Sequence, residues 1–408
     1  MKHQILCLLA ALSVVISLPA KPSGHLAHAA AQNAAVQLSA AAPHDTQSLK
    51  KRVKELLDNE IFERTLVGIY IYDLTDDRPV FMHNERQCMR PASNEKIVTA
   101  VTALRRLGTD YLLGTELYAR PTGEEGTAQL WVRGGYDPLF GAEDMQAFMQ
   151  KLQEIGVTKV DGAIGLDLTM KDSKQWGWGW CWDDDEVPLT PLLYDNKDNF
   201  VSELGKAMNE AGFEWNGFTR EEKVPADAEQ VCRRTHTIDQ LLLPMMKRSD
   251  NSMAEALFYQ IAASDSIPRA GRKQAVRHVE YLIGELGLDP THYQIADGSG
   301  LSLYNYLSPE LLGHLLRYAY SHEHIYNHLL PSMPIAGEDG TLRKRMKGTA
   351  AEGNVRAKTG TVEGVSTLSG YCTTAEGHLL CFSIMNQGIR RTSTGRNFQD
   401  RVCVALCE

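Results

Sequence analysis

Ser93 and Lys96 are the residues whose types and spacing most directly suggest chemistry. Just after them, the apolar residues Ile97, Val101 and Leu104 recur at helical spacing, which predicts a helix that begins near Ser93. Residues three apart lie on one face of a helix, and the positive end of the helix dipole stabilises an alkoxide and disfavours an ammonium. The pair therefore predicts a serine nucleophile activated by a lysine base, as in acyl-transfer sites of the Ser-x-x-Lys type.

The spacing of Ser93 and Lys96 also has a simpler explanation, in which Ser93 is only the N-cap of the helix. The same spacing occurs at Ser48 and Lys51, within a polar stretch that predicts an exposed amphipathic helix over residues 48–57. The motif alone does not decide between a nucleophile and a cap, so the decision rests on the other motifs of the chain.

The sequence Ser-Asp-Asn at residues 249–251 supports the catalytic interpretation. It opens a predicted helix, so its polar groups are gathered at the helix start. There the hydroxyl of Ser249 can relay a proton to a leaving amine, and Asn251 can bind the substrate amide. We therefore expect Ser249 and Asn251 to be catalytic residues beside Ser93 and Lys96.

The sequence Lys-Thr-Gly at residues 358–360 begins a predicted strand. Gly360 allows a ligand to approach the backbone closely, while Lys358 and Thr359 suit a substrate carboxylate. Each of the three motifs is weak alone, but their ordered occurrence is the three-part signature of penicilloyl-serine enzymes. A carboxylate site implies cleavage next to the C-terminus of a substrate chain.

Length, charge and the first residues indicate an exported protein of two or three domains. The chain has 408 residues and a formal net charge of −9, which argues against nucleic acid as a partner. Residues 1–20 are typical of a signal peptide, with Lys2 before an apolar run over residues 5–18, although a retained anchor stays open. Residues 21–45 are predicted to be a flexible leader.

Periodicity predicts an α+β fold in which strands from both ends of the chain share a sheet. A mainly β region, residues 114–227, with one helix, is predicted to interrupt a domain made of residues 46–113 and 228–408. The strands are predicted at residues 66–73, 79–83, 355–372 and 378–386, and the helices at residues 142–156, 237–243, 252–263, 267–286, 308–321 and 394–405.

Three clusters of residues allow other functions. Four tryptophans between residues 176 and 182 suggest core packing, which we favour, or a stacking wall for a ligand. Cys372 and Cys381 flank a predicted turn and could face each other across a hairpin. His324 and His328 lie one helical turn apart, but the zinc-protease spacing His-Glu-x-x-His is not met, so we expect a solvated helix face.

Over about residues 66–408 the chain resembles the class C, type-4 penicillin-binding proteins, the D-alanyl-D-alanine carboxypeptidases/endopeptidases of the bacterial envelope. The resemblance rests on six motifs in order: Pro91–Lys96, Gly134–Pro138, Trp176–Asp184, Ser249–Glu255, Asp297–Ser302 and Lys358–Thr361. One departure is Leu303, where members of the family often have arginine, so the preferred side chain of the substrate peptide stays open.

The resemblance implies a β-lactamase/transpeptidase-like domain, an antiparallel sheet flanked by helices, that is split by an inserted accessory region. It implies that Ser93 attacks a terminal D-Ala-D-Ala amide with Lys96 as base, and that the amides of Ser93 and Thr361 bind the oxyanion. The expected partners are peptidoglycan stem peptides and β-lactam antibiotics in the periplasm or cell envelope. No cofactor and no nucleic acid are expected, and a homo-oligomer is left open.

Two alternatives remain at this stage. One is a β-lactamase of the same fold, in which water accepts the acyl group efficiently. The bulky insertion after the Ser93 helix argues against it. The other is a wall-binding protein with a dead site, which the loss of a motif residue would have favoured, and none is lost.

Overall fold

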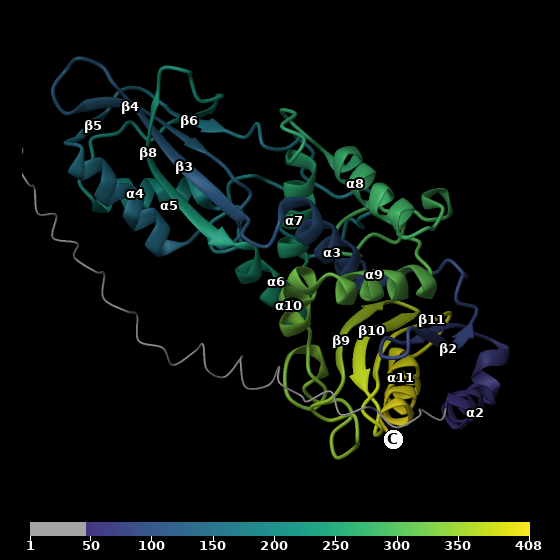
Figure 1. Cartoon of the computed structure of the whole chain (residues 1–408). Helices are drawn as coiled ribbons and strands as arrows, with labels where there is room; N and C mark the ends of the chain where they lie inside the picture. The colour runs from purple at the N-terminus through teal and green to yellow at the C-terminus, as the bar shows by residue number, and fades with distance from the viewer. Residues whose placement is uncertain (1–45) are drawn as a thin grey trace, which may run out of the picture. The chain divides into compact units, whose positions relative to one another are not determined.

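Two β-sheets and the helices that pack on them make up the described part of the chain, residues 46–408 of a computed structural model (Figure 1). The predicted signal peptide and leader, residues 1–20 and 21–45, lie outside the described residues. Within residues 46–408, no helix has the length and apolar character that crossing a membrane requires.

The first sheet has five antiparallel strands, in the order β2-β1-β11-β10-β9. Strand β1 pairs with β11 along its whole length, so the two ends of the chain meet inside this sheet, as the sequence predicts. Strands β10 and β11 are buried on both faces, which suits the mostly apolar sequence of β11, whereas β10 also buries Ser366, Thr367 and Ser369. The strands are β1 (Leu66–Asp73), β2 (Arg78–His83), β9 (Arg356–Val362), β10 (Val365–Thr373) and β11 (Leu379–Gln387).

The two faces of the first sheet border separate hydrophobic cores. On one face, helix α11 (Thr392–Cys407) packs on β10 and on α2 (Thr46–Leu57). On the other face, helix α9 (Pro309–Ser321) packs on β1 and β11 and joins the larger core (Figure 1). The sheet is therefore the middle layer of an α/β/α arrangement.

Helix α7 (Asn251–Ala263) is the centre of the larger core. Its residues are buried on all sides, which suits its mostly apolar sequence, although it also buries Ser252, Glu255 and Gln260. It packs against α3 and α8, and further helices close the core: α3 (Glu95–Leu107), α6 (Ile238–Lys247), α8 (Arg272–Glu285) and α10 (Glu323–Ser332). Helix α8 begins later than residue 267, because Arg269 has a left-handed φ of 57° and Gly271 is the N-cap.

The second sheet is mixed, with the order β7-β6-β4-β3-β8 and β5 beside β4. Helices α4 (Ala142–Glu154) and α5 (Phe200–Glu210) contribute to its core. The prediction of a single helix in this region was wrong, although the buried residues Phe200, Leu204 and Met208 of α5 follow helical spacing. Its strands are β3 (Leu112–Pro121), β4 (Thr127–Arg133), β5 (Lys159–Val160), β6 (Ile164–Asp167), β7 (Thr219–Glu221) and β8 (Glu229–Thr237).

The predicted strand over residues 355–372 is in fact a hairpin of β9 and β10. Val362 pairs with Val365, and Gly364 between them has a φ of 74° that favours glycine. The prediction that Cys372 and Cys381 face each other was also wrong. Cys372 pairs with Leu380, and Cys381 pairs with Tyr371, the residue before Cys372. The two thiols therefore point to opposite faces of the sheet and lie in different cores.

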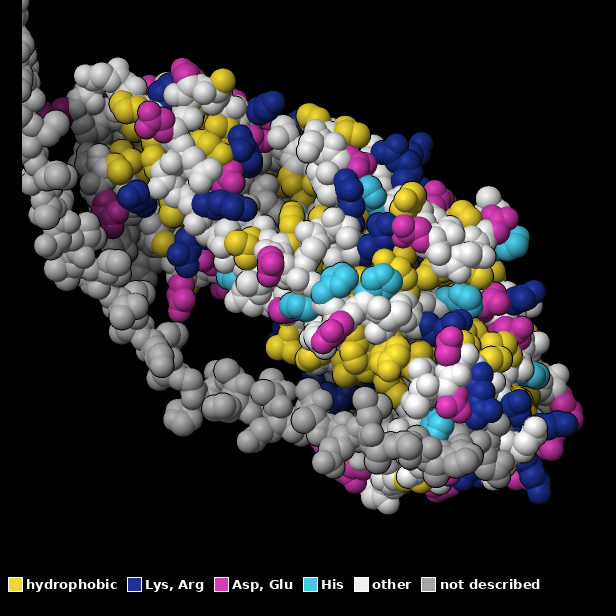
Figure 2. Space-filling view, in the orientation of Figure 1, with side chains coloured by type: hydrophobic (Ala, Val, Ile, Leu, Met, Phe, Trp, Pro, Cys, Tyr) yellow, Lys and Arg dark blue, Asp and Glu magenta, His cyan; other side chains and the backbone are white. Residues whose placement is uncertain are grey.

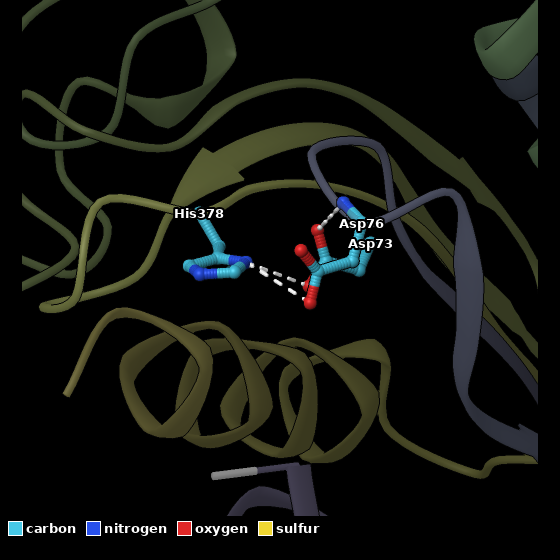
Figure 3. A group of neighbouring side chains, drawn as sticks. All are labelled: Asp73, Asp76 and His378. Carbon is cyan, nitrogen blue, oxygen red and sulfur yellow. Dashed lines mark hydrogen bonds and ion pairs between the residues drawn. The ribbon is translucent and has the colours of Figure 1, made fainter. Parts of the chain in front are cut away.

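A buried histidine and aspartate connect the β1–β2 turn to the turn between β10 and β11 (Figure 3). The Nδ1 atom of His378 lies 2.9 Å from Oδ2 of Asp73, and the other oxygen of Asp73 accepts hydrogen bonds from the amides of Thr75 and Asp76. Asp73, Asp76 and His378 could together offer three atoms to a metal ion. Because these hydrogen bonds already engage Asp73 and His378, we interpret the group as a structural connection.

Histidine side chains gather on the surface over α9 and α10 (Figure 2). His324 is exposed, His322 contacts the carbonyl of Tyr318 at 2.8 Å, and His328 forms an ion pair with Asp239 at 2.7 Å. The exposure of His324 agrees with the expected solvated helix face, whereas the contact of His328 joins α10 to Asp239 of α6.

Candidate active site

Ser93 lies in a single 3-10 turn, Ala92–Asn94, that leads directly into α3. The α-helix itself begins at Glu95 with Asn94 as its N-cap, one residue later than the cap interpretation of Ser93 requires. Ala92 has a φ of 46°, a conformation that is uncommon for residues other than glycine. Lys96, one turn along, donates a hydrogen bond from Nζ to Oγ of Ser93 at 3.0 Å. The structure therefore brings the predicted nucleophile and base into direct contact.

Two further acceptors surround the Nζ atom of Lys96, which is fully buried. It donates to Oδ1 of Asn251 at 2.6 Å and to the carbonyl oxygen of Ser299 at 2.7 Å. Burial lowers the pKa of Lys96 to about 8, while the charges of Asp297 and Glu255 oppose a larger fall. Roughly a tenth of the amine is therefore neutral near pH 7 and able to accept a proton.

The acidic residues beneath Lys96 also fix the loop that supplies the Ser299 carbonyl. Glu255 accepts hydrogen bonds from the amides of Gly298 and Ser299 at 3.0 and 2.9 Å, and burial and Asp297 raise the pKa of Glu255 to about 8. Asp297 accepts from the amide of Gly300 at 2.8 Å. Asp297 thus shapes this loop, and the Ser299 carbonyl is a site group that the sequence analysis missed.

A second serine–lysine pair lies at the start of α7 and the middle of β9. Lys358 is fully buried, and its Nζ donates to Oγ of Ser249 at 2.8 Å and to the carbonyl oxygen of Thr359 at 2.7 Å. Ser249 has a φ of 63°, just before Asp250 caps the helix by accepting from the amide of Met253. Burial, followed by the charge of Lys96, holds the pKa of Lys358 well below its usual range.

Strand β9 is the edge strand of the first sheet and is attached to the Ser93 turn. The side chain of Asn94 donates to the carbonyl oxygen of Lys358 at 3.1 Å. A Cβ on Gly360 would come within 2.7 Å of the carbonyl oxygen of Pro91, so glycine allows the close approach. Thr359 donates to Oγ1 of Thr341, while Thr361 is exposed further along the edge.

The predicted site residues are thus in two groups, which meet at the start of α7, where Ser249 and Asn251 lie two residues apart. Hydrogen bonds connect Ser93, Lys96 and Asn251 in one group and connect Ser249 and Lys358 in the other. Thr359 and Thr361 continue the second group along β9. An amine next to a serine, beside an edge strand whose buried Lys358 can bind an anion, is an arrangement suited to acyl transfer from a substrate that ends in a carboxylate.

The tryptophan-rich segment lies mostly on the surface, so the prediction of core packing was wrong for three of its four rings. Trp176, Trp178 and Trp182 are 55%, 46% and 96% exposed. Trp180 is different, because its Nε1 donates to Oδ2 of Asp297 at 2.9 Å, beneath the site. The number of aromatic residues in a segment does not indicate which face of the chain they occupy.

Glu186, from the same segment, is a site residue that the sequence analysis missed. Its carboxylate accepts a short hydrogen bond from Nδ2 of Asn251. No local pattern marks Glu186, because the contact joins residues 65 positions apart. The segment between β6 and α5 therefore contacts Asn251, one of the predicted catalytic residues, directly.

The fold and the three motifs define a penicilloyl-serine type of enzyme. More specifically, the chain belongs to the D-Ala-D-Ala carboxypeptidase 3 (S13) family, whose model matches residues 49–192 and 185–407. The resemblance to type-4 penicillin-binding proteins, the fold class and the prediction of a serine-type D-Ala-D-Ala carboxypeptidase are confirmed, and a β-lactamase is not favoured.

Known proteins resemble this chain in sequence or in fold over most of its length. A D-alanyl-D-alanine carboxypeptidase of Actinomadura sp. strain R39 is 29% identical over 459 residues, covering 88% of this chain and 84% of that protein. Penicillin-binding protein 4 of Haemophilus influenzae superposes with a TM-score of 0.77 at 21% identity, over 88% of this chain and 99% of that one. The complex of that protein with a β-lactam superposes with a TM-score of 0.70 at 22% identity, over 86% of this chain and 98% of that one.

Proposed function

We propose that this carboxypeptidase removes the terminal D-alanine from peptidoglycan stem peptides through an acyl-enzyme on Ser93. The observation that carries the proposal is the 3.0 Å contact between Lys96 Nζ and Ser93 Oγ, made by an amine whose pKa burial lowers to about 8. A neutral Lys96 takes the hydroxyl proton as Oγ attacks the carbonyl carbon of the scissile amide.

The substrate is held by groups on both sides of Ser93. Its terminal carboxylate binds Lys358 and Thr359, and Asn251 binds a substrate amide. The amides of Ser93 and Thr361 donate to the oxyanion that forms on attack. The role of the two amides is the one that the family resemblance implies, while the roles of Lys358, Thr359 and Asn251 are supported by the chemistry of their side chains.

The leaving step needs a proton on the departing amine. Ser249, which accepts a hydrogen bond from Lys358 at 2.8 Å, relays to this amine the proton that Lys96 took from Ser93, so that the C–N bond breaks, D-alanine leaves and Lys96 is neutral again. Water then attacks the Ser93 ester, which releases the shortened peptide and restores the hydroxyl. Hydrolysis of D-Ala cross-links, which is endopeptidase activity, would follow the same steps.

The setting of the enzyme is part of the proposal. The relatives named above are a D-alanyl-D-alanine carboxypeptidase and a penicillin-binding protein, which supports the cell envelope as the location and β-lactams as inhibitors. We also propose residues 114–227 as an accessory region inserted into a catalytic domain of residues 46–113 and 228–408.

Release of D-alanine from a synthetic peptide that ends in D-Ala-D-Ala tests the activity. The wild type should release D-alanine, and Ser93→Ala should abolish the release. Ser48→Ala is the matched control, since it alters the other Ser-x-x-Lys sequence and should retain full activity. Equal loss in both variants, or activity that survives Ser93→Ala, would contradict the role of Ser93.

A further inference from the structure

Glu186 occupies one end of a hydrogen-bonded chain that reaches the nucleophile. It accepts from Nδ2 of Asn251, whose Oδ1 accepts from Lys96 at 2.6 Å, and Lys96 in turn donates to Ser93 at 3.0 Å. Glu186 and Asn251 are both partly buried. The catalytic pair is therefore connected to the tryptophan-rich segment through a single amide side chain.

The amide of Asn251 has two different ends, and only one orientation satisfies its neighbours. A rotation by 180° would turn Nδ2, a donor, toward the ammonium group of Lys96, which is also a donor. It would turn Oδ1 toward the carboxylate of Glu186, which only accepts when ionised. Glu186 therefore selects the orientation in which Asn251 holds Lys96.

We infer that Glu186 is a positioning residue of this active site, which orients Asn251 and contributes negative charge that holds Lys96 in its resting ammonium form. The inference rests on the proposed function, since it assigns Glu186 a role toward the base of that reaction. It also gives the segment between β6 and α5 a part in catalysis without contact with Ser93.

Several charges face Lys96, and Glu186 differs from the others in its exposure. Asp297, Glu255, Glu186 and Asp250 each raise the pKa of Lys96, in that order. Burial raises the pKa of the neighbouring Glu95 well above its usual range, which Lys96 only partly opposes, and burial followed by Lys96 lowers the pKa of Lys358. Asp297 and Glu255 are fully buried and held by backbone amides. Glu186 lies instead on a segment at the surface, so it can be changed without disturbing the core.

The charge contribution has a definite sign. Removing the negative charge of Glu186 makes the ammonium form of Lys96 less favourable, so its pKa falls below about 8. The neutral amine then forms at lower pH. The acid limb of kcat/KM, which reports the base in the free enzyme, should move to lower pH as well.

Two substitutions separate orientation from charge. Glu186→Gln keeps an oxygen that can accept from Asn251 but removes the charge, so kcat/KM on the alkaline plateau should stay within about twofold while the acid limb moves to lower pH. Glu186→Ala removes both the accepting oxygen and the charge. The value of kcat/KM on the alkaline plateau should then fall about tenfold, because the Asn251 amide loses its fixed orientation. Asp183→Asn, an exposed acidic residue of the same segment, should leave the profile unchanged.

The experiment is D-alanine release by the three variants and the wild type over a range of pH. The inference is overturned if the Glu186→Gln profile superimposes on that of the wild type, or if Glu186→Ala raises kcat/KM, which would mean that Glu186 shields Asn251 from substrate. A shift in Asp183→Asn equal to that in Glu186→Gln would also overturn it. A wild type that releases no D-alanine would instead refute the proposed function itself.

Discussion

Lys96 and Lys358 are both fully buried beside a serine, yet their surroundings differ. Lys96, at the start of α3, is surrounded by acidic residues that keep its pKa at about 8. Lys358, on β9, has no such compensation, and burial and the charge of Lys96 hold its pKa well below the usual range. Burial by itself lowers the pKa of both amines, and the neighbouring carboxylates determine the size of the decrease.

The comparison assigns the two lysines different tasks. Lys96 can exchange a proton close to neutral pH, as a general base must. The pKa of Lys358 is well below its usual range, and a substrate carboxylate beside it would favour the ammonium form. We propose that the same residue type serves as a base on a helix and as an anion receptor on a strand.

Removing the base should have the largest effect. Lys96→Met should slow acylation of Ser93 by roughly 10³-fold or more, because no other group accepts the hydroxyl proton. In the wild type, acylation should rise with pH through about 8, since the neutral amine is the active form. Stopped-flow acylation by a β-lactam measures both effects.

Lys51→Met is the matched control, because Lys51 belongs to the other Ser-x-x-Lys sequence and lies on the exposed face of α2. It should acylate like the wild type. If Lys96→Met retained acylation within tenfold of the wild type, the assignment of Lys96 as base would be wrong.

Removing the anion receptor should have the next largest effect. Lys358→Met should lower kcat/KM for a D-Ala-D-Ala peptide by roughly 10²-fold, through loss of a charge-assisted contact with the carboxylate. In the wild type, converting that carboxylate to an amide should cost a similar factor. Lys358→Met tested with the amidated substrate should lower kcat/KM little more than either change alone. Additive losses in kcat/KM would contradict a direct contact between Lys358 and the carboxylate.

The glycine that supports the Ser93 turn should affect stability more than chemistry. Gly300 has a φ of 82°, and a Cβ there would overlap the carbonyl oxygen of Ala92. Gly300→Ala should lower the free energy of unfolding by about 3 kcal/mol, measured by urea denaturation. Gly287→Ala has a similar φ but open space around the Cβ, so it should cost about 1 kcal/mol. Equal losses would show that close packing under Ser93 is unimportant.

The smallest effect is expected from the tryptophan beneath the site. Trp180→Phe removes the Nε1 donor to Asp297 and should lower the free energy of unfolding by about 1 kcal/mol. Trp182→Phe, at a ring that is 96% exposed, should leave thermal unfolding unchanged. A larger loss from Trp182 than from Trp180 would mean that the exposed ring has a structural partner.

The sequence predicted the parts of the site that local spacing determines. Ser93 and Lys96 lie one helical turn apart, and the first sheet joins the two ends of the chain as predicted. The hairpin of β9 and β10 was predicted as one strand, because both halves are rich in β-branched residues and the turn at Gly364 is short. Glu186 could not be predicted, since its contact with Asn251 depends on the path of a long loop.

Intact mass spectrometry after incubation with benzylpenicillin tests the central claim most directly. The account predicts a persistent adduct of one penicilloyl group on the wild type and none on Ser93→Ala, because Ser93 is the residue that becomes acylated. Rapid consumption of the drug without a lasting adduct would point to a β-lactamase. An adduct that persists on Ser93→Ala, or no adduct and no turnover on the wild type, would contradict the acyl-serine mechanism.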